Sequence, residues 1–213
     1  MIWCNGELVE GSTLAVDITD RGLILGDGLF ETVKVSAGRP LFLAKHLARL
    51  QVSGRVIDLA IDGQWIRRGV MSLLKAHHAD CGVLRITMTR GPGPRGLAPV
   101  PADTQQPVAM ISFTKTDGRT HEQTLPDRLV EAPFIRSSAA MTSSHKTLSY
   151  ADNLAAMAFA KNKRAADVLF FNERGEATCT AMANIFVHTG LGYATPPLSA
   201  GVLPGVVRAV LIE

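Results

Sequence analysis

The sequence predicts an α+β fold, because strand-like and helix-like segments follow one another along the chain. Residues 29–35 and 83–89 alternate apolar and polar side chains, as half-buried strands do. Leu43, Leu47 and Leu50 instead recur with the spacing of one helix face. With 213 residues, of which 46% are hydrophobic and 19% charged, the chain can bury a sizeable core and is not disordered.

The other elements follow from the same periodicities and from turn residues. In the first half we expect a short strand at 2–9 that is broken by Asn5-Gly6, helices from Leu43 and at about 64–77, and a further strand at 108–113. In the second half we expect an extended segment at 128–135, a helix through Leu154 and Lys161, a buried strand at 167–171, a strand pair or bulged strand at 177–187, and a last helix after Gly205. Residues 113–125 show no periodicity, so we place an N-terminal domain at 1–114 and a C-terminal domain at 115–213.

The composition argues against several classes of function. There are 22 Lys and Arg residues and 19 Asp and Glu residues, and the net charge of +3 is spread along the chain, so nucleic acid is not an expected partner. Cys4, Cys81 and Cys179 are far apart and form no CxxC pair or Cys/His cluster, so neither a disulfide framework nor a metal site is expected. The sequence opens without a leader pattern, and no apolar run approaches the roughly 18 residues of a membrane span. We therefore expect a cytoplasmic protein with no membrane partner.

Lys146 is the first residue that could carry chemistry. It lies between the polar stretch 137–145 and a predicted helix, next to small polar side chains. An ammonium group that is desolvated in such a setting loses its proton more easily and becomes a nucleophile. From these residues alone, an ordinary surface lysine at the start of a helix is the simpler interpretation.

Three arginines and one glycine point to anionic groups. Arg49 lies on an otherwise apolar helix face, where a partly buried guanidinium needs a carboxylate or a phosphate. Gly205 precedes the last helix, whose first backbone N–H groups suit a phosphate, although a capping turn explains the same residues. Arg90 and Arg95 flank a rigid Gly-Pro loop, which either presents two cations to a substrate carboxylate or is only a structural connection.

Together these residues resemble one family. The motifs that carry the resemblance are Asp20-Arg21-Gly22 with Gly26-Asp27-Gly28-Leu29-Phe30-Glu31, residues 42–50, 90–96 and 146–150, residues 175–186 with Asn184-Ile185-Phe186, and Thr195-Pro196 with Leu203-Pro204-Gly205. In this order they resemble the class IV (fold-type IV) aminotransferases that depend on pyridoxal 5′-phosphate (PLP). That group includes branched-chain and D-amino-acid aminotransferases and aminodeoxychorismate lyase. The resemblance implies a small N-terminal α/β domain and a larger, β-barrel-like C-terminal domain.

The resemblance also implies a role for each matching residue. Lys146 matches the lysine that forms the internal aldimine and later moves a proton between Cα and C4′. Arg49 matches the arginine that binds the cofactor phosphate, together with the backbone at Val206 and Val207, and Tyr150 matches a partner of the phenolic oxygen. The expected cofactor-binding residues are Arg49, Lys146, Tyr150, Cys179, Thr180, Gly205, Val206 and Val207, and the expected substrate-binding residues are Phe30, Arg90 and Arg95.

The sequence departs from the family pattern in three places. Cys179 stands where the family has the glutamate that pairs with the pyridine nitrogen, and a neutral thiol is a poor substitute for a carboxylate. Val207 stands where the family often has a threonine whose hydroxyl contacts the phosphate. The sequence ends at Glu213 inside a predicted helix, so we expect the C-terminal domain to be incomplete relative to the family.

The function implied by the resemblance is PLP-dependent transamination between an amino acid and a 2-oxo acid. Aminodeoxychorismate lyase activity is an alternative, because the loop from Arg90 to Gly96 also suits an aromatic dicarboxylate. A PLP-binding protein with weak or no turnover is a third interpretation, which Cys179 favours. The expected partners are a small-molecule amino acid or 2-oxo acid and a second copy of the chain in a homodimer.

Overall fold

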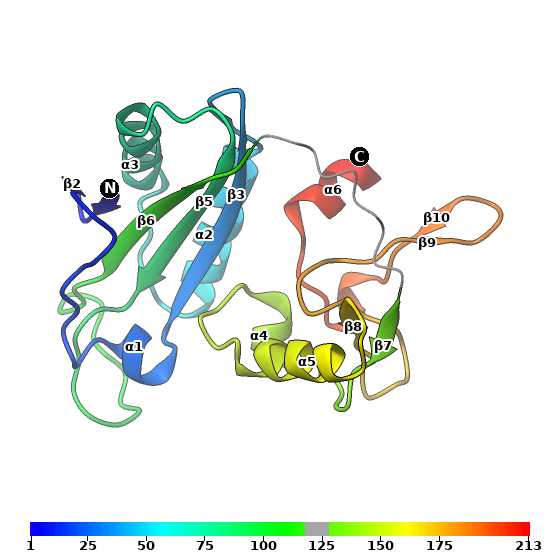
Figure 1. The fold of residues 1–213 in the computed structure, drawn as a ribbon. Coiled ribbons are helices and arrows are strands. Elements are labelled where there is room, and N and C mark those ends of the chain that lie inside the picture. The colour runs from blue at the N-terminus through cyan, green and yellow to red at the C-terminus, as the bar shows by residue number, and fades with distance from the viewer. Residues whose placement is uncertain (118–127) are drawn as a thin grey trace. The chain divides into compact units, whose positions relative to one another are not determined.

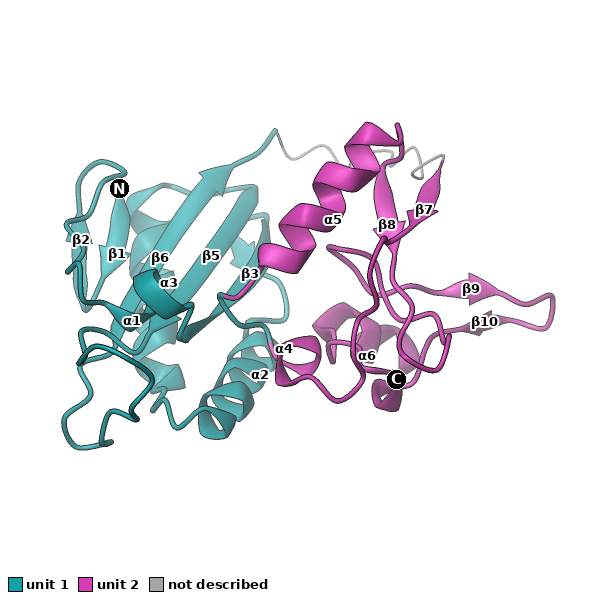
Figure 2. Ribbon diagram, turned by 90° about the horizontal axis from the view of Figure 1, so that it is seen from below, with its two compact units in different colours: residues 1–119, 146–148 teal, residues 120–145, 149–213 magenta. Residues whose placement is uncertain are grey.

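A computed structural model of the chain describes residues 1–117 and 128–213 (Figure 1). The chain divides into two compact units (Figure 2): unit 1 is Met1–Arg119 with Lys146–Leu148, and unit 2 is Thr120–His145 with Ser149–Glu213. The junction expected at 113–125 falls partly outside the described residues. Each unit combines helices and strands, as the α+β prediction requires.

Unit 1 is built on a six-stranded antiparallel sheet. Its strand order is β2-β1-β6-β5-β3-β4, with β1 at Ile2–Cys4, β2 at Glu7–Val9, β3 at Gly28–Ser36, β4 at Arg39–Pro40, β5 at Gly82–Thr89 and β6 at Val108–Lys115. The pairing register places Leu29 opposite Met88 and Val33 opposite Leu84. Because directly opposed residues share a face, the apolar positions of β3 and β5 gather on the same side of the sheet.

Two helices cover that apolar side. Helix α2 (Leu43–Val56) packs against β3, and α3 (Gly63–Ala76) packs against β6 and β1, whereas the short α1 (Arg21–Leu25) lies near β5. The carboxylate of Asp62 accepts hydrogen bonds from the backbone of Gln64 and Trp65, so it caps α3. The core of unit 1 includes Leu47, Leu50, Val70, Leu73, Leu84, Ile86 and Ile111.

A short segment from much later in the chain completes the edge of this sheet. Thr147 forms an antiparallel bridge with Leu29. The Phe30 N–H donates to the carbonyl of Lys146 over 2.9 Å, and the Leu148 N–H donates to the carbonyl of Gly28 over 3.0 Å. A Cβ on Gly28 would lie 2.3 Å from the Met88 carbonyl oxygen, so only glycine allows β3 and β5 to approach each other this closely at position 28.

Unit 2 has shorter elements. Strand β7 (Leu129–Glu131) pairs in parallel with β8 (Asp167–Leu169), β9 (Val187–His188) pairs antiparallel with β10 (Tyr193–Ala194), and the helices are α4 (Met141–Ser144), α5 (Ala151–Asn162), the 3₁₀ helix Leu198–Ala200 and α6 (Val206–Ile212). Its core contains Ala156, Ala160, Val168, Phe170, Cys179, Ala181 and Val202. Among the described residues, no helix is both long and apolar enough to cross a membrane.

The strand pair expected at 177–187 is shorter than predicted. Only isolated bridges, Phe171 with Ala177 and Cys179 with Asn184, precede β9 in this stretch. The reason is a tight turn, in which the hydroxyl of Thr180 accepts hydrogen bonds from the backbone of two following residues, 182 and 183. This local bonding competes with a continuous strand ladder.

Candidate active site

Lys146 is held in unit 1 by the sheet edge. Its backbone carbonyl is fixed by β3, and its ammonium nitrogen lies 4.2 Å from the ring centroid of Phe30. The guanidinium carbon of Arg85 lies 4.0 Å from the same centroid. The aromatic ring, which is 4% exposed, therefore attracts two cations and restricts where the Lys146 amine can lie. The structure thus brings together Lys146 and Phe30, two of the residues predicted from the sequence.

Arg49 belongs to a buried cluster on the helical side of the same sheet. Its Nε and Nη2 donate to the two carboxylate oxygens of Glu31 over 2.8 and 2.6 Å, and Nδ1 of His46 lies 2.7 Å from the same carboxylate. Glu31 is fully buried. Burial alone raises the pKa of Glu31, but hydrogen bonds from His46 and Arg49 and their charge outweigh burial and hold that pKa below its usual range.

Glu31 is therefore the carboxylate partner that Arg49 requires. The sequence predicts a carboxylate or a phosphate there, and sequence analysis did not identify Glu31. A signal was present: in the alternating segment 29–35, Glu31 is an acidic residue on the face that Leu29 and Val33 bury. The bidentate contact orients the Arg49 guanidinium. The role of Arg49 toward a cofactor phosphate stays a prediction.

Arg90 has structural partners. It is buried, and its Nε and Nη2 donate to Asp27 over 2.7 and 2.9 Å. Nη1 and Nη2 also donate to the carbonyls of Asp58 and Ile57 over 2.9 and 2.6 Å. Arg90 therefore ties the start of its loop to the end of α2, and a substrate carboxylate would have to displace these bonds. Arg95, by contrast, is exposed, and the substrate-binding role expected for both arginines stays a prediction.

Asp27 is the acid that organises this loop. It accepts from Arg90 and also from Nε of Arg21 over 3.0 Å, while Nη1 of Arg21 donates to the carbonyl of Gly96 over 3.2 Å. Burial by itself raises the pKa of Asp27, but hydrogen bonds from Arg90 and Arg21 and their charges outweigh it and lower that pKa. Both ends of the loop at 90–96 are thus fixed by charged side chains.

In unit 2, Cys179 lies in the core. It is 9% exposed, and its carbonyl accepts the N–H of Phe170 over 3.0 Å. Burial raises the pKa of the Cys179 thiol, and the nearby charge of Arg136 opposes that rise only in part. The thiol is therefore neutral near neutral pH.

The other predicted residues of unit 2 lie at turns and helix starts. Tyr150 immediately precedes α5, and the Thr180 hydroxyl is engaged in the turn described above. Gly205 precedes α6, and a Cβ there would lie 1.9 Å from Oδ1 of Asn184. A side chain at 205 would therefore displace the Asn184 amide, and within the described residues no side chain caps the start of α6. The backbone N–H groups of Val206 and Val207 are thus presented by a helix start without a side-chain cap.

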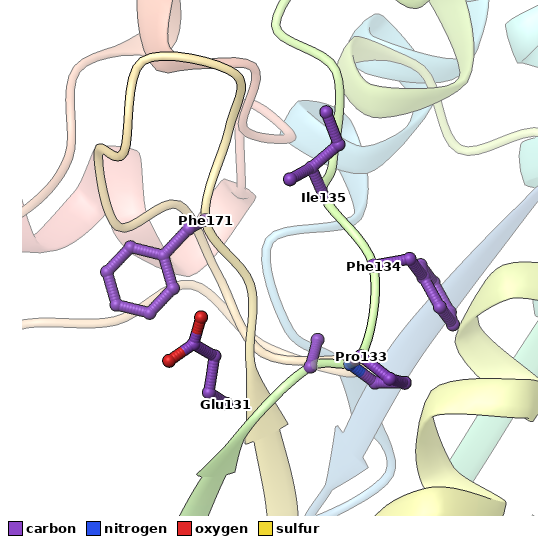
Figure 3. A pocket seen from close by; sticks show the side chains of 6 residues that line it. Glu131, Pro133, Phe134, Ile135 and Phe171 are labelled. Atoms are coloured by element: carbon purple, nitrogen blue, oxygen red, sulfur yellow. The ribbon is translucent and has the colours of Figure 1, made fainter.

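A separate pocket in unit 2 does not contain these residues. It has a volume of about 160 Å³ and is lined by Glu131, Phe171 and the segment from Ala132 to Ile135 (Figure 3). This is smaller than the roughly 300 to 1,000 Å³ of typical small-molecule sites. Its lining includes none of the predicted site residues, so we assign no ligand to it.

Comparison with known proteins places these features in one family. The family model described as "Amino-transferase class IV" matches residues 28–213. The bifunctional aminodeoxychorismate lyase / D-amino acid transaminase of Mycobacterium tuberculosis is 30% identical over 229 residues, which cover 100% of this chain and 77% of that protein. The predicted family is therefore confirmed.

Solved structures agree. The 4-amino-4-deoxychorismate lyase from Pseudomonas aeruginosa matches with a TM-score of 0.84 and 28% identity, over 100% of this chain and 76% of that one. An aminotransferase from Mycobacterium tuberculosis in a PLP-bound form matches with a TM-score of 0.82 and 28% identity, over the same shares. A form of that protein with alpha-ketoglutarate and PMP bound gives a TM-score of 0.83. The fold-type IV architecture and PLP as the cofactor of these relatives are confirmed, and the chain belongs to the class IV aminotransferase family.

Proposed function

We propose that this chain binds PLP covalently through Lys146 and transfers amino groups between an amino acid and a 2-oxo acid. The observation that carries the proposal is the placement of Lys146, whose backbone is fixed on β3 and whose amine lies 4.2 Å from the Phe30 ring centroid. A primary amine that is held in this way has little conformational freedom to lose when it forms a covalent bond. The relatives named as aminotransferases support the reaction class.

The residues of the chain fit this cofactor. In unit 1, Lys146 supplies the amine that its aldehyde needs, and Arg49 is a cation suited to its phosphate. The family resemblance adds the backbone of Val206 and Val207 as phosphate donors. The glycine at 205 leaves room for the Asn184 side chain and places no side chain of its own at the start of α6. Two residues match poorly: Cys179, whose neutral thiol replaces a carboxylate, and Val207, which lacks the hydroxyl that the family often has at the phosphate.

Each residue then has a distinct task. PLP supplies an electron-withdrawing ring that makes the Cα proton of a bound amino acid removable. We propose that Nζ of Lys146 accepts this proton and returns it at C4′. Phe30 limits the positions of that amine, and Arg49, oriented by Glu31, anchors the phosphate so that the reacting atoms stay in register. Arg90 and Arg95 are the proposed cations for a substrate carboxylate.

Two further candidate functions have specific support. Lyase activity toward 4-amino-4-deoxychorismate is favoured by relatives that carry this name. Weak or absent turnover is favoured by the buried, neutral thiol of Cys179, because without a carboxylate the ring nitrogen is not held protonated and withdraws electrons less strongly.

Reconstitution with PLP distinguishes these functions. We expect the purified chain to gain absorbance between about 330 and 430 nm that survives dialysis, as a covalently attached cofactor does. If the chain is a transaminase, this absorbance should then change slowly after stopped-flow mixing with L- or D-amino acids, as the amino group is transferred to the cofactor. Release of 4-aminobenzoate from 4-amino-4-deoxychorismate would identify the lyase instead. A chain that stays colourless in excess PLP would contradict all three functions.

We also propose that the chain forms a homodimer. The face of the unit 1 sheet opposite α2 and α3 carries Thr32, Val83 and Arg85, and all three are exposed in the single chain. An open sheet face of this kind is commonly covered by a second copy in symmetric assemblies. Light scattering at micromolar concentration should report twice the mass of the chain, and a monomer at that concentration would contradict the proposal.

A further inference from the structure

Arg136 is a half-buried cation in unit 2 to which the sequence alone assigns no role. Its guanidinium carbon lies 4.2 Å from the ring centroid of Phe170, and its Nη2 donates to Oδ1 of Asn153 over 3.3 Å. Asn153 in turn donates to the carbonyl of Ala181 over 2.5 Å. These contacts hold the guanidinium against Phe170 and Asn153, and both residues also hydrogen-bond to the segment that contains Cys179.

Both neighbours are linked directly to that segment. Phe170 exchanges backbone hydrogen bonds with it, because its N–H donates to Cys179 and its carbonyl accepts from Thr178. Ala181, whose carbonyl Asn153 contacts, lies two positions after Cys179, in the turn that Thr180 forms. Arg136 is thus linked through Phe170 and Asn153 to the segment that contains Cys179, and its charge acts on the Cys179 thiol.

The Nε–H of Arg136 has no acceptor. It is buried and finds no hydrogen-bond partner among the residues that the structure describes. A buried donor without an acceptor costs about 1 to 3 kcal/mol, and more when the group is charged, so it calls for an explanation such as a bound water or ligand atom. A ligand that accepts a hydrogen bond here would remove this cost.

We propose that Arg136 is the charged group next to the pyridine nitrogen of the cofactor, donates a hydrogen bond to that nitrogen and keeps it unprotonated. The inference rests on the proposed function, which puts the pyridine nitrogen beside residue 179. A pyridine nitrogen without a proton is an acceptor, which is what the Arg136 N–H lacks, whereas a pyridinium would bring two donors and two positive charges together.

The other polar groups nearby are consistent with this assignment. Cys179 is a neutral thiol, and Asn153 is uncharged. Asp167 is buried, but its Oδ1 already accepts the N–H groups of Val168 and Ala181 over 2.7 and 3.1 Å. At the Cys179 sulfur the charge of Arg136 has a larger effect than that of Asp167, so the local field disfavours an added proton.

The test is a nitrogen NMR measurement on the full chain loaded with PLP that carries ¹⁵N in the pyridine ring. Free PLP in acid and in alkali gives the reference shifts of the protonated and unprotonated nitrogen. We expect the bound cofactor to show the unprotonated shift near neutral pH. Arg136→Gln should move the protonation midpoint upward by about one pH unit or more, the effect of removing one close charge.

Two variants serve as controls. Arg136→Lys keeps the charge and should leave the midpoint close to that of the wild type. Arg174→Gln removes a half-exposed arginine of the same unit, which is paired with Glu173 and Glu176, and should also leave the midpoint unchanged. An Arg136→Gln midpoint equal to that of the wild type would overturn the inference.

The wild-type spectrum decides the question even if Arg136→Gln does not fold. A protonated shift near neutral pH in the wild type would overturn the inference while leaving PLP binding intact. A chain that takes up no labelled PLP would instead overturn the proposed function together with this inference. The two failures are therefore distinguishable in one experiment.

Discussion

Lys146→Ala is expected to abolish covalent attachment of PLP and to reduce amino transfer by at least about 100-fold, because it removes both the amine and the proton carrier. Reduction of the loaded wild type with borohydride, followed by peptide mass spectrometry, should place the cofactor mass on the peptide that contains residue 146. The variant should lose its cofactor absorbance on dialysis.

The matched control for this change is Lys163→Ala. Lys163 also has its amine near an aromatic ring, 5.6 Å from the Phe159 centroid, but it lies at the end of α5 in unit 2. It should keep the label and the activity of the wild type. If Lys146→Ala still carried the label after reduction, another amine would be the attachment site and the proposed function would lose its central residue.

Arg49→Ala separates binding of the cofactor phosphate from covalent attachment in the same experiment. It removes a charge-assisted contact to the phosphate but leaves the attaching amine in place. PLP affinity should fall by about 2 to 3 kcal/mol, or roughly 30- to 150-fold in Kd, while the reduced protein still carries the label. Normal affinity would show that Arg49 serves only as the partner of Glu31.

Glu31→Gln is expected to destabilise unit 1 by about 3 to 5 kcal/mol, because it leaves the Arg49 guanidinium without its buried counter-charge. Both tryptophans of the chain, Trp3 and Trp65, lie in or against the core of this unit, with ring centroids 4.9 Å apart. Urea unfolding followed by tryptophan fluorescence therefore reports on the unit that contains the change. Glu173→Gln, at a half-exposed ion pair with Arg174, should have a far smaller effect.

The pH dependence follows from the lowered pKa of Glu31. A carboxyl with a lower pKa in the folded state stabilises that state fully above its unfolded-state pKa of about 4.3. This contribution is lost as the pH falls through the lower folded-state pKa. The difference in unfolding free energy between wild type and Glu31→Gln should therefore shrink below about pH 4. A difference that stays constant down to the acid transition would contradict the ion pair.

Much of unit 1 could be predicted from the sequence because its elements carry clear periods. The alternation at 83–89 and the leucine spacing from Leu43 specify β5 and α2 without knowledge of any partner. The roles of Arg49 and Arg90 could not be predicted in this way. Their partners, Glu31 and Asp27, are distant in sequence, and an isolated arginine gives no indication of which acid neutralises it.

Unit 2 was predicted less completely for a related physical reason. Its strands are short, and side-chain hydrogen bonds such as those of Thr180 replace part of the backbone ladder that a periodic pattern would indicate. Arg136 has no sequence signal at all, since its importance lies in an unsatisfied N–H that only the packing of Phe170 and Asn153 creates. The candidate lysine, by contrast, was identified because a recognisable motif surrounds it.

The late position of Lys146–Leu148 in the sequence affects how unit 1 folds during synthesis. As the polypeptide leaves the ribosome, β1 to β6 can all pair once Lys115 has emerged, but the edge of β3 at Gly28 and Phe30 still awaits the hydrogen bonds that residues 146–148 supply. Those hydrogen bonds form only when the chain returns with residues 146–148. The nascent N-terminal half is therefore open to edge-to-edge aggregation, and the strand that ends this risk is the one that brings the proposed catalytic amine into place.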